Sequence, residues 1–187
     1  NKYLKRPSNA SENYFGRSKI YFVHIPKTGG TSIQSLFRSL DDQIENSGVD
    51  RVSNISHLSK HAKAHEIISV IGKHQWDQLF TFAIVRNPWD LVVSSYNWWQ
   101  QIAFESRKGM YETCMIRRMS FDEFVESKYG RYFINEHIGS IQDWYEYNGN
   151  RIVSYVVKLG EINIAVGEIL DRLDLGKPCQ SLSVPTL

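Results

Sequence analysis

The stretch that decides the fold covers residues 19–32 and reads KIYFVHIPKTGGTS. Residues 20–25 form an almost unbroken apolar run, which is typical of a strand buried on both faces of a parallel sheet. Pro26 ends the predicted strand, and the glycine pair that follows favours a tight turn. Thr31 or Ser32 then opens a predicted amphipathic helix. The stretch therefore predicts a strand, a turn and a helix in direct succession.

This unit has the parts of a cradle for an anion. Backbone N–H groups at a helix start have no partner within the helix, and the helix dipole adds partial positive charge. Lys27 would add a full positive charge beside them. The P-loop consensus places its lysine after the glycines, whereas Lys27 precedes Gly29 and Gly30, so the stretch is not a Walker loop. A plain strand–turn–helix corner with a solvated lysine is the alternative interpretation.

The composition suits a globular protein with a sizeable core, because 42% of the 187 residues are hydrophobic. A net charge of +2 is too small to indicate a nucleic-acid binder. Cys114 and Cys179 lie far apart and predict neither a zinc site nor a disulfide framework. No stretch approaches the ~18 apolar residues of a membrane span. We therefore expect no membrane segment and a cytoplasmic protein, with an N-terminal anchor outside this sequence as the alternative.

The order of the elements predicts the fold class. We expect a loose arm over residues 1–18 and a single domain over 19–187. Further strands are predicted over 79–85 and 151–159. Further helices are predicted over 61–71, from Pro88 to about Phe104, at FDEFVES and over 162–173. Irregular chain is predicted over 41–60, 105–118 and 129–150. This alternation predicts an α/β, P-loop-NTPase-like, three-layer fold in which helices flank a central parallel sheet.

A second anion site is predicted where the strand over 79–85 ends. Arg86 follows this strand directly, and Ser94 lies about two turns up the next helix. A guanidinium and a hydroxyl so placed could grip one phosphate from two sides. Pairing of Arg86 with Asp90 is the alternative. The next helix is predicted to pack through an apolar face formed by Trp89, Val92, Val93, Tyr96, Trp99 and Ala103.

Together, IPKTGGTS and VRNPWDLVVSSY resemble the sulfotransferases, in particular their short carbohydrate-type branch, which includes many bacterial members. The resemblance is good over residues 20–96 and continues weakly to about Leu173. In that family the first motif holds the 5′-phosphosulfate of 3′-phosphoadenosine 5′-phosphosulfate (PAPS), the second holds the 3′-phosphate, and no metal is used. The resemblance implies these PAPS-binding residues: Lys27, Thr28, Gly29, Gly30, Thr31, Ser32, Arg86 and Ser94.

The resemblance also implies an in-line transfer of the sulfuryl group to an acceptor hydroxyl, which resembles phosphoryl transfer. Lys27 is the candidate for stabilising the charge that develops on the leaving 5′-phosphate. The acceptor needs a general base, which in this family is often a histidine after the first helix; the similar KHA segment favours His61 over His65. At the N-terminus of the predicted helix, the dipole would keep His61 neutral.

Other titratable residues receive lesser roles. His57 and Glu66 are weaker candidates for the base, and His24 is expected to be a hydrogen-bonded core residue. No set of His, Cys and carboxylate residues has the spacing of metal ligands, so no metal site is expected.

The acceptor is expected to be a carbohydrate in preference to a phenol. Six aromatic residues could stack on a sugar, although we expect most of them in the core: Tyr129, Tyr132, Phe133, Trp144, Tyr145 and Tyr147. The family often has a late Arg-Phe-Glu motif, of which only Glu161 in VVKLGEIN is present here. Some members also have an Arg-Lys-Gly motif near the C-terminus, and the Arg-Lys-Gly at 107–109 lies too early in the sequence to match it. A kinase-like nucleotide-binding protein and a non-catalytic nucleotide binder are the alternative functions.

Overall fold

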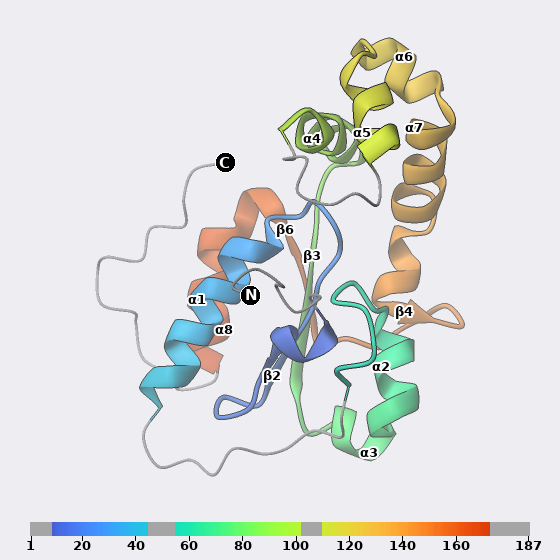
Figure 1. The fold of residues 1–187 in the computed structure, drawn as a ribbon. Coiled ribbons are helices and arrows are strands. Elements are labelled where there is room, and N and C mark those ends of the chain that lie inside the picture. Colours follow the sequence, from blue (N-terminus) through green and yellow to red (C-terminus); the bar gives the residue numbers. More distant parts are fainter. Residues whose placement is uncertain (1–8, 45–54, 102–109, 173–187) are drawn as a thin grey trace, which may run out of the picture. The chain divides into compact units, whose positions relative to one another are not determined.

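The structure, a computed structural model, describes residues 9–44, 55–101 and 110–172. These residues form two compact units (Figure 1). The first unit contains the described residues up to Val85 and from Gln142 onward, and the second contains those from Arg86 to Ile141. The single domain expected over 19–187 stays a prediction.

A four-stranded sheet forms the centre of the first unit. Its strands are β1 (Tyr14–Phe15), β2 (Ile20–Val23), β3 (Phe80–Val85) and β6 (Tyr155–Lys158), in the order β1-β2-β3-β6. β2, β3 and β6 are parallel, and β1 pairs antiparallel with β2. All four residues of β2 are buried, as predicted for a strand covered on both faces. The predicted α/β fold with a mostly parallel central sheet is confirmed.

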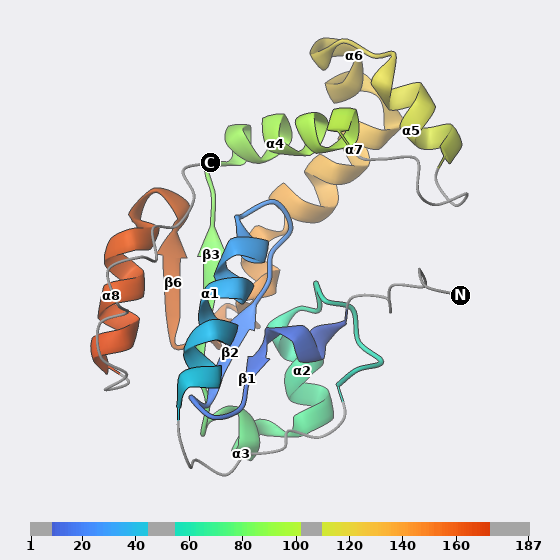
Figure 2. The same cartoon turned by 60° about the vertical axis from the view of Figure 1, so that its left-hand side comes forward.

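Helices cover both faces of this sheet (Figures 1 and 2). One face carries α1 (Gly30–Gln43) and α8 (Ile162–Arg172), and the other carries α2 (Ala64–Ile71) and α3 (Lys73–Trp76). Phe37 of α1 packs on Phe82 of β3, with ring centroids 5.1 Å apart. On the opposite face Tyr21 of β2 packs on Trp76 at 5.6 Å. The alternation of side chains along the strands thus gives each helical layer its own core.

Short elements complete the first unit. They are the helical turns η1 (Ala10–Asn13), η3 (Ile141–Trp144) and η4 (Leu159–Glu161) and the strands β4 (Glu146–Tyr147) and β5 (Asn150–Arg151). The turn between β4 and β5 has φ of 51° at Asn148 and 74° at Gly149, a conformation that an Asn-Gly pair favours. Residues 10–15 form η1 and β1, unlike the loose arm that we expected, because Tyr14 and Phe15 pair with β2.

The second unit is helical. It consists of α4 (Pro88–Gln101), α5 (Met110–Arg117), α6 (Phe121–Glu126), α7 (Lys128–Phe133) and the π-helical turn η2 (Ile134–Ile138). Its core gathers around Val92, Ile116 and Phe124. The predicted start of α4 is confirmed, since the Asn87 side chain accepts a hydrogen bond from the Trp89 N–H at 2.9 Å. Ser120 and Glu123 form a capping box at the start of α6, where the sequence predicts a helix.

The packed face of α4 differs from the prediction. Trp89 and Val93 are 79% and 44% exposed, whereas Leu91 and Ser95, which are not in the predicted face, are buried. Val92 is buried as predicted. Tyr96 and Trp99 do pack against the core of the second unit, and Ala103 lies outside the described residues. Periodicity alone could not choose between two neighbouring faces that both carry apolar residues.

Two segments expected to be irregular are helical. The described part of 105–118 contains α5, and 129–150 contains most of α7 together with η2 and η3. A Cβ on Gly130 would lie 2.1 Å from the Phe124 carbonyl oxygen. The glycine therefore allows α7 to approach the end of α6 closely.

The strand predicted over 151–159 is shorter, because the backbone before it has other partners. The Ile152 N–H donates to the Tyr145 carbonyl at 2.9 Å, and the Ser154 N–H donates to the Thr81 hydroxyl at 2.9 Å. Of the loop expected over 41–60, residues 41–43 continue α1 and residues 45–54 lie outside the described residues.

Candidate functional site

A left-handed turn joins β2 to α1. Lys27 has φ of 64° and Gly29 has φ of 78°. The left-handed region is uncommon for a residue with a side chain, so the conformation of Lys27 must be imposed by its surroundings. Gly29 is the N-cap of α1 and offers no side chain to its first N–H groups. A lysine and the positive end of a 14-residue helix therefore lie within three residues of each other.

The turn is supported from within. Thr28 is fully buried, and its hydroxyl donates to the Ile25 carbonyl at 2.9 Å. Because the Thr28 hydroxyl donates within the loop, an anion at this turn would contact Thr28 through its backbone N–H. Thr31 is exposed and Ser32 is half-buried, both in the first turn of α1.

His24 sets the space available at the start of α1. A Cβ on Gly30 would lie 2.0 Å from Nε2 of His24, which is far inside van der Waals contact. Only glycine therefore fits at this position while the imidazole stays in place. The glycine identified as a turn residue in the sequence has a second role here, because it admits a side chain from the preceding strand end.

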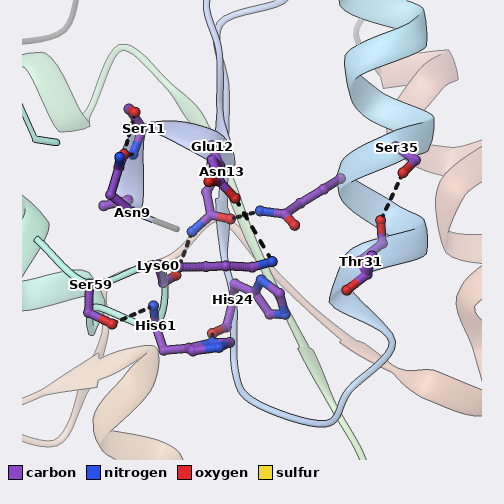
Figure 3. Close-up of polar contacts among 12 residues, drawn as sticks. Asn9, Ser11, Glu12, Asn13, His24, Thr31, Ser35, Ser59, Lys60 and His61 are labelled. Carbon is purple, nitrogen blue, oxygen red and sulfur yellow. Dashed lines mark hydrogen bonds and ion pairs between the residues drawn. The ribbon is translucent and has the colours of Figure 1, made fainter. Parts of the chain in front are cut away.

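His61 lies directly beside His24 (Figure 3). The two rings meet edge to face, with centroids 4.5 Å apart. Nδ1 of His61 lies 2.8 Å from the His24 carbonyl oxygen, which can only accept a hydrogen bond. Nδ1 must therefore carry a proton, and in the neutral ring Nε2 holds the lone pair. This is the tautomer that a general base acting through Nε2 requires.

The prediction that a helix begins at His61, and that its dipole keeps this histidine neutral, is wrong. The helix starts at Ala64 and not at His61, because the Lys63 N–H donates to the Glu66 carboxylate at 2.6 Å and closes the first turn there. His61 lies in the turn before α2, so the dipole of this helix does not act on it as predicted. The same bond occupies Glu66, the weaker candidate for the base.

His24 is held neutral. Burial first, then the charge that His61 carries when it is protonated, and then the charge of Lys60 lower the pKa of His24 from 6.5 to about 2. The residue is 4% exposed, which agrees with the core position that we expected. Its Nδ1, however, is buried and has no hydrogen-bond partner among the described residues, so the expected hydrogen bonding is not found there.

The other candidate bases lie in different surroundings. His65 is part of α2 and stacks on Tyr147, with ring centroids 5.4 Å apart. His57 is exposed.

Tyr147 is 54% exposed, and Tyr132 is 65% exposed, whereas Phe133 and Trp144 are buried. The aromatic cluster is therefore divided between the core and the surface.

Arg86 and Ser94 belong to the second unit, while the cradle belongs to the first. Arg86 directly follows β3, and Ser94 is half-buried within α4. β2 and β3 are parallel neighbours with Val23 opposite Ala83, so both strands end at the same edge of the sheet.

Glu161, the one residue that matches the late Arg-Phe-Glu motif, is exposed in η4 and lies 3.9 Å from the Lys158 ammonium. Residues 107–109 lie outside the described residues.

A buried polar cluster beside His61 was not predicted. It contains Asn13 and Gln34 and reaches the Lys60 carbonyl. Asn13 is separated from Lys60 by 47 positions, and no pattern in the sequence marks the two as partners. A short polar residue in a polar segment is ordinarily exposed, so only the tertiary structure reveals its burial.

Within the described ranges, no group of three or more His, Cys, Asp or Glu residues is arranged to hold a metal ion. None of the helices in these ranges is long and apolar enough to span a membrane.

A central, mostly parallel sheet with a strand–turn–helix cradle at its carboxyl edge places the protein among the P-loop-like α/β proteins. The model of the sulfotransferase family matches residues 13–164. The chain therefore belongs to the sulfotransferase family. Comparisons with curated proteins and with solved structures gave no match.

The burial of His24 predicts a change in acid stability. In the unfolded chain a histidine takes up a proton as the pH falls through about 6.5, whereas folded His24 stays neutral. The unfolding free energy is therefore highest above this pH and decreases as the pH falls below it. In the wild type, His24 should account for a decrease of about 2 kcal/mol between about pH 7.5 and about pH 5. We expect this part of the decrease to be absent in His24→Gln.

Urea unfolding at several pH values, followed by circular dichroism, measures this difference. His74→Gln is the matched control, because His74 is exposed. Equal pH dependence in the wild type and His24→Gln would contradict the neutral, buried state of His24.

Proposed function

We propose that the protein transfers a sulfuryl group from PAPS to a hydroxyl of a carbohydrate, with 3′-phosphoadenosine 5′-phosphate as the second product. Membership of the sulfotransferase family supports the reaction class. The single observation that carries the proposal is the fixed His61 ring beside a helix-start anion cradle, in which Nδ1 is tied to the His24 carbonyl at 2.8 Å.

The cradle has the properties that a 5′-phosphosulfate needs. The first N–H groups of α1, the positive end of the helix and Lys27 would face its oxygens. PAPS would supply the sulfuryl group, and its phosphate would leave. Lys27, held in a left-handed conformation, is the residue that would stabilise the negative charge developing on the leaving oxygen.

His61 would accept the proton of the acceptor hydroxyl through Nε2. Its tautomer is set before the acceptor arrives, so no rearrangement of protons is needed when the acceptor binds. Near neutral pH an imidazole combines a usable basicity with a large neutral fraction.

Arg86 and Ser94 would hold the 3′-phosphate. Arg86 follows β3 directly, and β3 ends at the same sheet edge as β2, which precedes the cradle. A guanidinium can contact two phosphate oxygens at once, and a serine hydroxyl can donate a further hydrogen bond. These two residues would then distinguish PAPS from a nucleotide that lacks the 3′-phosphate.

Titration calorimetry with 3′-phosphoadenosine 5′-phosphate, compared with ATP and magnesium, tests the donor. Tight binding of the bisphosphate is expected, and tight binding of ATP without it would favour the kinase-like alternative. A transfer screen over glycans and phenols then identifies the acceptor. Binding of the bisphosphate without transfer to any acceptor would favour a non-catalytic nucleotide binder.

For His61→Ala we expect kcat to fall by about 10²–10⁴-fold, because the acceptor loses its proton acceptor. The dissociation constant of 3′-phosphoadenosine 5′-phosphate should stay within about twofold, since the proposed role concerns the acceptor. Sulfate-transfer kinetics and calorimetry measure the two quantities. His74→Ala serves as the matched control. Near-normal turnover of His61→Ala with both substrates saturating would remove His61 from the mechanism.

For Lys27→Ala we expect turnover to fall by about 10²–10³-fold, with a smaller loss of affinity for 3′-phosphoadenosine 5′-phosphate. A leaving-group role stabilises charge that develops only in the transition state. Lys19→Ala is the matched control, because Lys19 is also a lysine with positive φ, at the opposite end of β2. Equal losses of turnover and affinity would reduce Lys27 to a general phosphate clamp.

A further inference from the structure

Asn13, at the end of η1, is a fully buried polar residue that joins three parts of the first unit. Its side-chain N–H donates to the Lys60 carbonyl at 2.7 Å, and its side-chain oxygen accepts from the Gln34 amide at 2.5 Å (Figure 3). It also lies beside the hydroxyl of Tyr21 in β2, which donates to the Ala10 carbonyl at 3.4 Å. The residue is 1% exposed. Asn13 therefore connects the turn before α2 with α1 and β2.

The orientation of the Asn13 amide is determined by its partners. The Lys60 carbonyl can only accept, so it must face the Asn13 nitrogen. The Asn13 oxygen is then left for the Gln34 N–H, as the second hydrogen bond requires. The buried amide thus uses both its donor and its acceptor side, and this favours one well-defined arrangement.

The Lys60 carbonyl belongs to the peptide unit that leads into His61. The His61 N–H donates to the Ser59 hydroxyl at 3.1 Å, and its ring is tied to the His24 carbonyl. Two further links hold the same turn against the N-terminal segment. The Ala10 N–H donates to the Leu58 carbonyl at 3.1 Å, and the Lys60 ammonium lies 4.0 Å from the Glu12 carboxylate.

We propose that Asn13 is a positioning residue for His61: it fixes the peptide that precedes this histidine, so that Nδ1 stays on the His24 carbonyl and Nε2 is presented to the acceptor. This inference rests on the proposed role of His61 as the base. Asn13 lies outside the two motifs that define the cradle and the second phosphate site.

The expected consequence is kinetic more than structural. A displacement of about 1 Å at a reacting group can reduce the rate about 10²-fold, even when substrate binding persists. Loss of the bond from Asn13 to Lys60 should loosen the turn, and the His61 ring should then exchange between its two tautomers.

Asn13→Asp and Asn13→Ala test the proposal. Aspartate preserves the size of the side chain and can still accept from Gln34, but it places an oxygen against the Lys60 carbonyl. Tyr21→Phe is the matched control, because it removes a buried hydroxyl next to Asn13 and leaves the hydrogen bond from Asn13 to Lys60 intact.

Two measurements on the full chain decide the outcome. The ¹⁵N shifts of the His61 imidazole should report a protonated Nδ1 in the wild type and in Tyr21→Phe, and a mixture of tautomers in both Asn13 variants. The kcat of both Asn13 variants should fall about 10- to 100-fold, while the affinity for 3′-phosphoadenosine 5′-phosphate stays within about twofold. The kcat of Tyr21→Phe should change by less than about threefold.

An unchanged His61 tautomer in Asn13→Asp, or equal loss of kcat in Asn13→Asp and Tyr21→Phe, would overturn the positioning role. The imidazole spectrum does not depend on turnover. A wild type that transfers no sulfate would therefore count against the proposed function, while the spectrum would still decide whether Asn13 holds His61.

Discussion

The contact between the His24 imidazole and Gly30 is the constraint on which the site depends. The ring occupies the space that a Cβ at the first residue of α1 would need, with Nε2 of His24 2.0 Å from that position. The end of β2 and the start of α1 thereby approach each other closely on either side of the turn in which Lys27 is left-handed. The carbonyl of the same histidine binds the His61 ring, so one residue shapes the anion cradle and orients the proposed base.

This arrangement places two imidazoles with different burial next to each other. His24 is buried, and burial lowers its pKa so far that it stays neutral near physiological pH. It can therefore lie against the ring of His61 without the repulsion that two imidazolium groups would feel. His61, by contrast, is only partly buried, and its proton is fixed on Nδ1 by a backbone carbonyl. Preorganisation of this kind reduces the rearrangement that a proton transfer would otherwise require.

Local patterns predicted much of the fold and the cradle. β2, the glycine turn and α1 follow from neighbouring residues, as do the starts of α4 and α6 at Asn87 and Ser120. Predictions failed where an apolar pattern allowed two answers or where a cap was unusual. Trp89 is exposed because the adjacent face of α4 packs, and α2 begins late because Glu66 caps the backbone of Lys63, which is not a typical capping residue.

The sequence by itself determined the central strand, the cradle and the two motifs that resemble sulfotransferases, because strand burial, turn chemistry and helix starts depend on residues a few positions apart. Only the tertiary structure decided that Asn13 supports the turn of His61, that His24 excludes a side chain from Gly30, and which tautomer His61 adopts. These features depend on the direction of single hydrogen bonds and on close packing between segments up to 47 positions apart, which no local periodicity records.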